Sequence, residues 1–225
     1  MDLAAEAGGD DKTRVRPAAT VILLRDGPSG PEVLMGMRGA SAAFMPSKFV
    51  FPGGAVDEAD ARVPLAGLPA PVCLRRLGDE GPALAAAAIR ELWEETGLPL
   101  GVKGAWTAPD GWKGFAGRGL RPDASGLRFV FRAITPPGRP RRFDARFFVA
   151  EAARLAADPD DFSAACDELS HLQWLPLAEA RRLDLPFITE VVLAEVSALA
   201  QGRDAGPGVP FFDNSGPVPT FRRLE

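Results

Sequence analysis

The chain has 225 residues, of which 46% are hydrophobic and 25% are charged, with a formal net charge of −4 and a pI near 5.2. This length and composition are typical of a globular domain with a large buried core and argue against a disordered chain. The acidic balance argues against sequence-independent nucleic-acid binding, which needs an accumulated basic surface, so we expect a small-molecule partner.

Signals for export or membrane insertion are missing from the sequence. The first residues, MDLAAEAGGDDKTRVRP, contain no apolar core of signal-peptide length, and no run approaches the roughly 18 apolar residues of a membrane span. Cys73 and Cys166 are the only cysteines, which excludes a disulfide framework and a zinc-type spacing. We therefore expect a cytoplasmic protein without a membrane partner, and the assembly state is open, with a homodimer among the alternatives.

The first part of the chain predicts an arm followed by a β-hairpin. Residues 1–17 are small, charged and without periodicity, which is typical of a loose arm. The segment AATVILLRD (18–26) predicts a buried strand, and after the turn GPSGP the segment EVLMGMR (32–38) predicts its hairpin partner. KFVFPGG (48–54) predicts a short strand that runs into paired glycines.

A helix is expected after a proline-rich segment. Residues 55–81 contain too many prolines for one long helix, although APVCLRRL (70–77) suits a short one. The next helix is expected to have Gly81 as its cap and Pro82 as its first residue, where a missing N–H costs nothing. We expect it to end at Gly97, which has no Cβ to oppose the left-handed turn that closes a helix.

The second half of the chain predicts more strands, a closing helix and a tail. LRFVFRAIT (127–135) and RRFDARFFVAE (141–151) predict an antiparallel pair, and HLQWLPL (171–177) predicts a last strand. PFITEVVLAEVSALAQG (186–202) has the 3.6-residue periodicity of a helix. The Pro/Gly-rich residues 203–225 predict a tail folded over the body, anchored by Phe211, Phe212 and Phe221. This order predicts an α/β fold with a mixed, partly antiparallel sheet covered by helices on both faces.

Three carboxylates gather on one edge of the predicted central helix. At about 100° per residue, Glu91, Glu94 and Glu95 lie beside the apolar arc that packs on the core. Like charges at this spacing cost about 0.2–0.5 kcal/mol per pair, and the negative end of the helix dipole opposes them further. A divalent cation would turn that repulsion into ligation, since Mg²⁺ and Mn²⁺ prefer carboxylate oxygens. Arg90 offsets part of the repulsion through an i,i+4 pair with Glu94. The alternative to metal binding is a Glu-rich surface helix.

The same helix carries half of a known motif. RELWEETGL (90–98) matches every specified position in the second half of G-x₅-E-x₇-R-E-U-x-E-E-x-G-U, where U is a bulky apolar residue. The chain thereby resembles the Nudix hydrolases. In the first half, Gly54 takes the glycine position and Asp60 stands where the family usually has glutamate. The matched positions are Gly54, Asp60, Arg90, Glu91, Leu92, Glu94, Glu95, Gly97 and Leu98.

The spacing of the two halves departs from the pattern. Arg90 follows Gly54 by 36 residues instead of 14, so 22 residues are inserted, at about 61–81. With FVFPGG before it and RFDARFF after it, this insertion is similar to that of the Nudix subgroup that includes peroxisomal coenzyme A diphosphatases. The resemblance implies a Nudix-type α/β/α sandwich over residues 18–202, in which a loop–helix–loop holds a divalent metal, Mg²⁺ or Mn²⁺.

The resemblance also implies roles for the motif residues. Glu91 and Glu95 are the implied direct metal ligands. Glu94 is implied as a further ligand or as the group that polarises water, and Arg90 as the residue that orients the glutamates. Gly53, next to the motif glycine, lets a backbone carbonyl approach the same ions because it has no side chain.

Further candidates lie outside the helix. By resemblance, a loop near the last strands supplies a base or an extra ligand six residues before a tryptophan, which indicates Glu168 ahead of Trp174, with Asp167 and Asp144 as competitors. Asp144 and Arg146 alternate with apolar residues along a predicted strand, so they either face a substrate cleft or pair with a neighbouring strand. Arg38, at a strand end, either meets a substrate phosphate or is simply exposed.

The functional expectation is a metal-dependent hydrolase that cleaves a diphosphate bond in a nucleoside diphosphate derivative. Coenzyme A or its thioesters are the first substrates expected, although RGASAAFMPSKFVFPGG keeps only Arg38 and the FPGG end of the longer upstream signature. The alternative is a Nudix fold used for ligand sensing or protein binding. Loss of a motif glutamate would favour that alternative, and all three in the helix are present.

Overall fold

The computed structural model describes residues 14–42, 44–203 and 206–225, and most of the predicted arm lies outside these residues. The helices are α1 (Pro71–Leu77), α2 (Gly81–Thr96), α3 (Lys113–Gly117), α4 (Leu177–Ala180) and α5 (Phe187–Ala200). The strands are β1 (Val15–Gly27), β2 (Gly30–Arg38), β3 (Phe49–Val50), β4 (Gly53–Ala55), β5 (Gly101–Lys103), β6 (Leu120–Pro122), β7 (Arg128–Ile134), β8 (Arg142–Glu151), β9 (Leu169–Pro176), β10 (Val209–Asp213) and β11 (Thr220–Leu224).

A mixed sheet forms the centre of the molecule. Its strand order is β11-β10-β7-β8-β1-β2-β3, with β4 paired to β1 and β9 paired to β2. β1 and β8 are parallel, with register pairs from Val15↔Arg142 to Leu24↔Glu151, and β10 is parallel to β7. The hairpins β1–β2 and β7–β8 are antiparallel, as predicted. The predicted mixed sheet is therefore confirmed.

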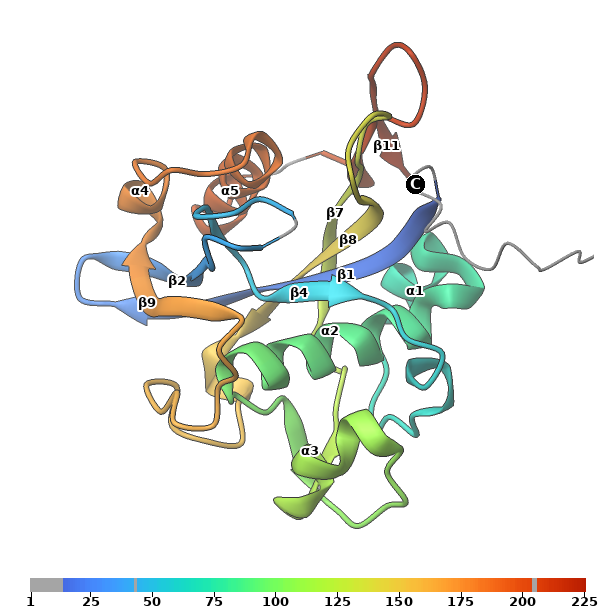
Figure 1. Cartoon of the computed structure of the whole chain (residues 1–225), viewed down its shortest axis with the longest axis vertical. Helices are drawn as coiled ribbons and strands as arrows, with labels where there is room; N and C mark the ends of the chain where they lie inside the picture. Colours follow the sequence, from blue (N-terminus) through green and yellow to red (C-terminus); the bar gives the residue numbers. More distant parts are fainter. Residues whose placement is uncertain (1–13, 43, 204–205) are drawn as a thin grey trace, which may run out of the picture.

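Helices cover both faces of this sheet, α2 on one and α5 on the other (Figure 1). β1 is central, so its alternating side chains enter two different cores. Val21 and Leu23 face α2, whereas Ile22 and Leu24 belong to the cluster under α5. All four are buried, and each such side chain stabilises the fold by about 1.5–3 kcal/mol relative to exposure.

One predicted strand is divided in the structure. Residues 48–54 were expected to form a single strand, but β3 pairs with β2 and β4 pairs with β1. Pro52 separates them, and its carbonyl accepts the N–H of Val21. Because proline has no N–H to donate to a ladder, the chain changes partner here.

The predicted start of the central helix is wrong by one residue. α2 begins at Gly81, with Pro82 second, because a 3₁₀ turn at Gly78–Glu80 leads directly into it and Glu80 already has helical dihedral angles. The helix ends at Gly97 as predicted.

The Pro/Gly-rich tail forms the last two strands of the sheet. β9 was expected to be the last strand, but β10 and β11 follow it and add one edge to the sheet. Phe211 is only 1% exposed and acts as the predicted anchor, whereas Phe221 is 56% exposed. The pairing of β10 with β7 explains this difference, since it places Phe211 beside the core.

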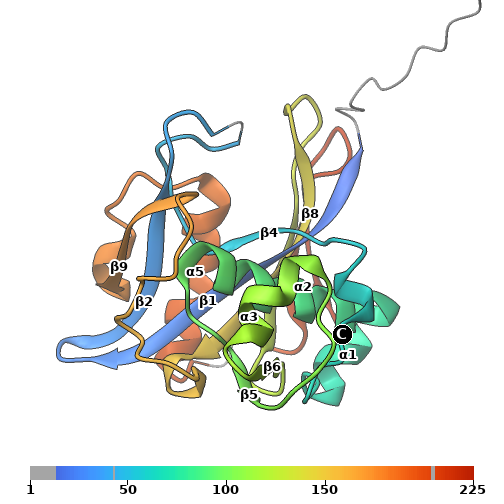
Figure 2. The same ribbon diagram turned by 60° about the horizontal axis from the view of Figure 1, so that its bottom comes forward.

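The inserted residues join a small layer outside α2. β5 and β6 form a separate two-stranded sheet that lies with α3 beside α2 (Figure 2). The insertion is tied to this layer by backbone hydrogen bonds from Ala66 N–H to the Pro122 carbonyl and from Ala124 N–H to the Gly67 carbonyl. Consequently α2 is enclosed on both sides, by the sheet and by this outer layer.

Candidate functional site

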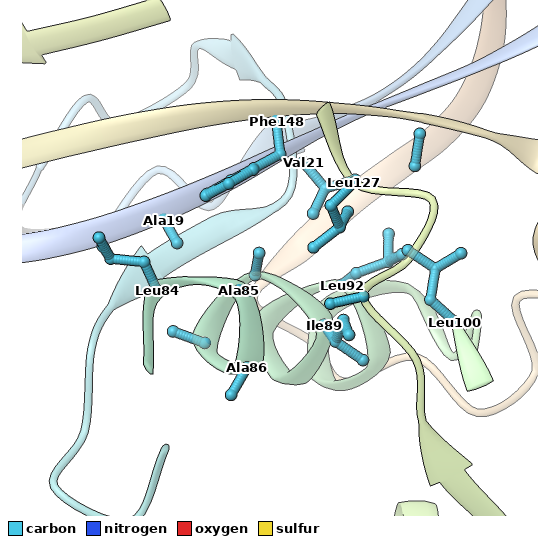
Figure 3. Packing of buried hydrophobic residues seen from close by; sticks show 14 of the residues in the cluster. Ala19, Val21, Leu84, Ala85, Ala86, Ile89, Leu92, Leu100, Leu127 and Phe148 are labelled. Carbon is cyan, nitrogen blue, oxygen red and sulfur yellow. The ribbon is translucent and has the colours of Figure 1, made fainter. Parts of the chain in front are cut away.

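The orientation of α2 fixes where its carboxylates point. Ala85, Ile89 and Leu92 are fully buried against the sheet (Figure 3). Leu98, at the last apolar position of the motif, is fully buried in the same core. Gly97 has a φ of +74° and donates its N–H to the Trp93 carbonyl at 2.8 Å, which closes the helix.

The two glycines of β4 lie against the glutamates of α2. The N–H of Gly53 donates to Glu95 Oε2 at 2.7 Å. A Cβ at Gly53 would lie 2.6 Å from the carbonyl oxygen of Ala19, and a Cβ at Gly54 would lie 2.5 Å from both carboxylate oxygens of Glu91. Any side chain at position 54 would therefore displace Glu91, so the glycine pair is a steric requirement of the site.

Arg90 is the centre of a buried charge network. Its side chain is 6% exposed, and its Nε and Nη2 donate to the two oxygens of Asp60, each at 3.0 Å. Nη1 donates to Glu91 Oε1 at 2.8 Å and to Glu94 Oε2 at 3.0 Å, and Nη2 also donates to the Ala55 carbonyl at 2.9 Å. The guanidinium thus holds two of the helix carboxylates in place, and the predicted Arg90–Glu94 pair is present.

A second arginine, Arg38, holds Glu168 beside the carboxylates of α2. Arg38, at the end of β2, contacts Glu168 Oε1 at 2.7 Å through Nη2 and approaches Glu95 Oε1 at 3.9 Å through Nη1. Arg38 and Leu169 are register partners in the β2–β9 pairing, which explains why the residue just before β9 lies beside Arg38. Two candidates that are 130 positions apart in the sequence therefore meet at the α2 carboxylates.

Burial raises the pKa of all three α2 glutamates. Desolvation, together with the neighbouring carboxylates Glu94 and Glu168, raises the pKa of Glu91 to about 7, although Arg90 opposes this shift. The pKa of Glu95 is well above its ordinary value, first because of burial and then because of the charge on Glu91. Burial also raises the pKa of Glu94. The buried surroundings therefore solvate the negative charge of these three glutamates poorly, and this favours a bound cation.

The donor atoms fit a divalent cation. Glu95 Oε1 is buried and has no hydrogen-bond partner among the residues that the structure describes, an arrangement that is costly unless a cation or a proton meets that oxygen. Within the described part of the chain, no three His, Cys, Asp or Glu side chains form a ready-made ligand cage. Mg²⁺ does not need one, since it binds through one or two carboxylates and completes its shell with water and substrate phosphate. Glu95 and Glu91 are thus suitable ligands.

Arg146 and Asp144 lie away from this group. Arg146 Nη2 contacts Glu80 Oε2 at 2.9 Å, at the beginning of α2, about 16 Å along the helix axis from Glu91 at 1.5 Å per residue. Asp144 accepts two hydrogen bonds from Arg132 of the adjacent strand β7, at 2.8 and 2.7 Å. The sequence left open whether Asp144 faces a substrate cleft or pairs with a neighbouring strand. In the structure it pairs with Arg132 of the neighbouring strand. Asp167, the other competitor, is exposed.

Two residues near the site have no counterpart in the sequence interpretation. Asp57 lies 3.8 Å from Arg90 through its carboxylate, and its charge contributes to the raised pKa of Glu94. The indole N–H of Trp112 donates a hydrogen bond to the buried carboxylate of Asp60. The acidic stretch VDEAD near the motif glycine was a signal for Asp57, whereas nothing in the sequence around Trp112 indicates its position.

The layered mixed sheet, with glutamates on a helix that follows a glycine-rich strand, defines a Nudix-type α/β/α fold. A model of the NUDIX domain matches residues 14–196. The chain belongs to the NUDIX family.

Individual relatives agree with this assignment. A protein of Caenorhabditis elegans that carries the name nudix hydrolase 7 is 31% identical over 176 residues, 71% of this chain, and the chain spans about half the length of that relative (51%). The crystal structure of a NUDIX hydrolase from Alicyclobacillus acidocaldarius is similar with a TM-score of 0.67 and 30% identity, over 86% of this chain and 99% of that one. The Ap4A hydrolase of C. elegans, with a TM-score of 0.50 and 17% identity over 84% of this chain and 99% of that one, shares the fold.

Across residues 14–42, 44–203 and 206–225, none of the helices has the length and apolar character needed to cross a bilayer.

Proposed function

We propose that the chain is a divalent-metal-dependent hydrolase that cleaves a diphosphate bond in a nucleoside diphosphate derivative. The observation that carries this proposal is the Glu95 carboxylate, which is 1% exposed and has one oxygen without a hydrogen-bond partner among the described residues. Glu91 and Glu168 are both close enough to raise its pKa. Three converging carboxylates, one with a buried oxygen that lacks a hydrogen-bond partner among the described residues, oppose folding unless a cation or a proton offsets the charge, and metal binding is the role that supplies such a cation.

We assign the α2 residues the following roles. Glu91 and Glu95 hold the metal together with a backbone carbonyl at Gly53, and Glu94 is a further ligand or polarises water. Arg90 keeps Glu91 and Glu94 oriented through its Nη1 hydrogen bonds. When bound, Mg²⁺ or Mn²⁺ supplies positive charge that neutralises the phosphoryl oxygens.

We assign Glu168 the role of base. Its side chain is 51% exposed and paired with Arg38, so solvent water can reach it. A substrate phosphate that binds Arg38 would replace Glu168 as the partner of the guanidinium, since phosphate and guanidinium form strong bidentate pairs. Glu168 would then be free to accept a proton from the attacking water.

Within this class we propose coenzyme A or a coenzyme A thioester as the first substrate to test. The support is the resemblance of the FPGG segment and the insertion to the coenzyme A diphosphatase subgroup. The insertion is packed against the layer outside α2, where Arg121 donates to the carbonyls of Pro64 and Leu65. We place the activity in the cytoplasm, where the free cysteines Cys73 and Cys166 would stay reduced.

A substrate panel tests the proposal. Coenzyme A, acetyl coenzyme A, NADH, ADP-ribose and diadenosine polyphosphates are incubated with the protein and Mg²⁺ or Mn²⁺, with EDTA as the metal control. We expect cleavage of one compound far above the rest, abolished by EDTA and by Glu95→Gln. Glu190→Gln, at an exposed position of α5, is the matched control and should retain full activity.

Two results would contradict the proposal. Undiminished turnover in Glu95→Gln would remove the assigned metal site. No cleavage of any compound, by a folded protein that still binds metal, would instead indicate that this NUDIX fold serves as a ligand-sensing or protein-binding module.

A further inference from the structure

Trp112 lies outside every motif position and is fully buried behind α2. It ends the 3₁₀ turn Asp110–Trp112, in the segment that leads from β5 to α3. Its ring packs edge-on against Trp106, with ring centroids 5.7 Å apart, and against Phe115, with centroids 5.5 Å apart. Its indole N–H points away from this aromatic cluster and donates to Asp60 Oδ1 at 3.3 Å.

Asp60 is 1% exposed, and four donors surround its carboxylate. Oδ1 accepts from Arg90 Nε at 3.0 Å and from the Trp112 indole. Oδ2 accepts from Arg90 Nη2 at 3.0 Å and from the backbone N–H of Asp57 at 2.9 Å. Each oxygen therefore has two hydrogen-bond partners, so the buried carboxylate is held from both sides.

Arg90 has no spare donor. Its five N–H groups match the five hydrogen bonds described above, two of which go to Asp60 and two to Glu91 and Glu94. A shift of Asp60 must therefore move the guanidinium, and with it the two glutamates. The position of Asp60 is thus coupled to the geometry of the metal site.

We propose that Trp112 is a positioning residue of the metal site, an inference that rests on the proposed function. Asp60 occupies a motif position that usually carries glutamate, so its carboxylate reaches about 1.5 Å less far. The indole N–H of Trp112 reaches that carboxylate from the outer layer and fixes it against Arg90. The residues of the outer layer thereby contribute to the orientation of Glu91 and Glu94.

The first test compares two tryptophans of the same cluster. Trp112→Phe keeps an aromatic ring but removes the hydrogen bond to Asp60. Trp106→Phe is the matched control, because the indole of Trp106 donates at 2.8 Å to the Leu120 carbonyl, away from any carboxylate. Mn²⁺ affinity is measured by electron paramagnetic resonance without substrate, and thermal unfolding is recorded for both variants.

We expect Trp112→Phe to weaken Mn²⁺ binding about five- to tenfold, which matches the typical net contribution of one hydrogen bond. Trp106→Phe should change it less than about twofold, with a comparable loss of thermal stability. Equal Mn²⁺ affinities in the two variants would overturn the proposal.

The second test is rescue by a longer carboxylate. In the otherwise unchanged protein, Asp60→Glu should weaken Mn²⁺ binding, because the extra methylene pushes the carboxylate toward the buried Trp112 indole, whose nitrogen already lies 3.3 Å from Asp60 Oδ1. In the Trp112→Phe background, the same change should restore binding above that of either single variant. Simple additivity of the two losses would contradict a positioning role, since independent sites add.

The inference can be tested separately from the hydrolase assignment. Mn²⁺ affinity needs no substrate, so a protein that cleaves nothing in the panel still gives a decisive answer. If Trp112→Phe does not fold, the unmodified protein is titrated with Mg²⁺ instead. The titration is followed by NMR through the indole N–H resonances of the tryptophans. The Trp112 resonance should shift with Mg²⁺ and the Trp106 resonance should not, and an unshifted Trp112 resonance would overturn the proposal.

Discussion

Glu95 combines deep burial with a raised pKa, which has a consequence for stability. Because its pKa is higher in the folded state, its favourable contribution to folding is complete below the unfolded pKa, near 4.5, and is lost as pH rises through the folded pKa. Glutamine keeps the shape and can still accept the Gly53 N–H, but it carries no charge. Without metal, Glu95→Gln should therefore be more stable than the unmodified protein at pH 8, and the difference should shrink toward pH 4.

Chemical unfolding at both pH values measures this effect. Glu190→Gln, in the first turn of α5, should not gain stability at pH 8, because ionised Glu190 interacts favourably with the positive end of the helix dipole. A Glu95→Gln variant that is less stable at pH 8 would mean that its charged form stabilises the fold.

Glu91 predicts a pH dependence of metal binding. Its pKa, raised to about 7 by burial, leaves the carboxyl largely protonated at pH 6. Metal ligation requires the deprotonated form, so binding releases a proton. We expect Mn²⁺ affinity to rise by up to about tenfold per pH unit below 7 from the Glu91 proton alone, and the raised pKa of the second ligand, Glu95, should add to this rise. Titrations from pH 5.5 to 8.5 check this expectation, and Glu91→Gln should bind more weakly with a flatter profile.

At the residue level, the sequence predicted contacts that depend on helical spacing. Glu91, Glu94 and Glu95 share an edge of α2, and Arg90 pairs with Glu94, because these relations follow from the helix itself. The Arg38–Glu168 pair joins residues far apart in the chain and follows only from the register of two strands. Trp112 could not be predicted, since its role depends on how the outer layer packs.

At the level of elements, the end of α2 links helix closure to the loop that carries Glu168. A Cβ at Gly97 would lie 3.0 Å from the backbone of Ala164 and Ala165, and φ is +74° there. Gly97→Ala should cost about 1–2 kcal/mol through backbone strain alone. The new methyl group should also displace the loop, so we expect activity to fall by more than tenfold.

Gly119→Ala provides the control for Gly97→Ala. Gly119 has a similar φ of +71°, but an added Cβ there would have no neighbouring atom within 4 Å in the described part of the chain. It should lose stability and keep its activity in thermal unfolding and turnover assays. Equal activity in the two variants would show that the loop tolerates the methyl group.

Elements with a clear apolar pattern were predicted well, and those with none were missed. The long strands β1 and β8 and the helices α2 and α5 have buried faces that set their period. β10 lies in a segment dominated by proline and glycine, where turn residues mask a short strand. Its identity as a strand depends on pairing with β7, which no local pattern shows.

At the scale of the whole molecule, the C-terminal strands should be part of the stable core. The ring of Phe211 is 1% exposed and lies beneath the guanidinium groups of Arg132 and Arg222, at 4.4 and 4.8 Å from the ring centroid. Phe211→Ala should destabilise the protein by about 3–5 kcal/mol. Phe221→Ala, at a 56% exposed position of β11, should cost less than about 1 kcal/mol. Thermal and denaturant unfolding distinguish the two, and similar losses would contradict a structural role specific to Phe211.

The parallel pairing of β1 with β8 determines when the molecule can fold. Register partners such as Val15 and Arg142 are separated by 127 positions in the chain, and this pair of strands forms the middle of the sheet. During synthesis, the apolar side chains of β1 must wait for β8 to leave the ribosome before the central ladder closes. Since distant pairings slow folding, the nascent chain exposes the apolar residues of β1 until β8 has been made, and chaperones that shield apolar segments should matter to its yield.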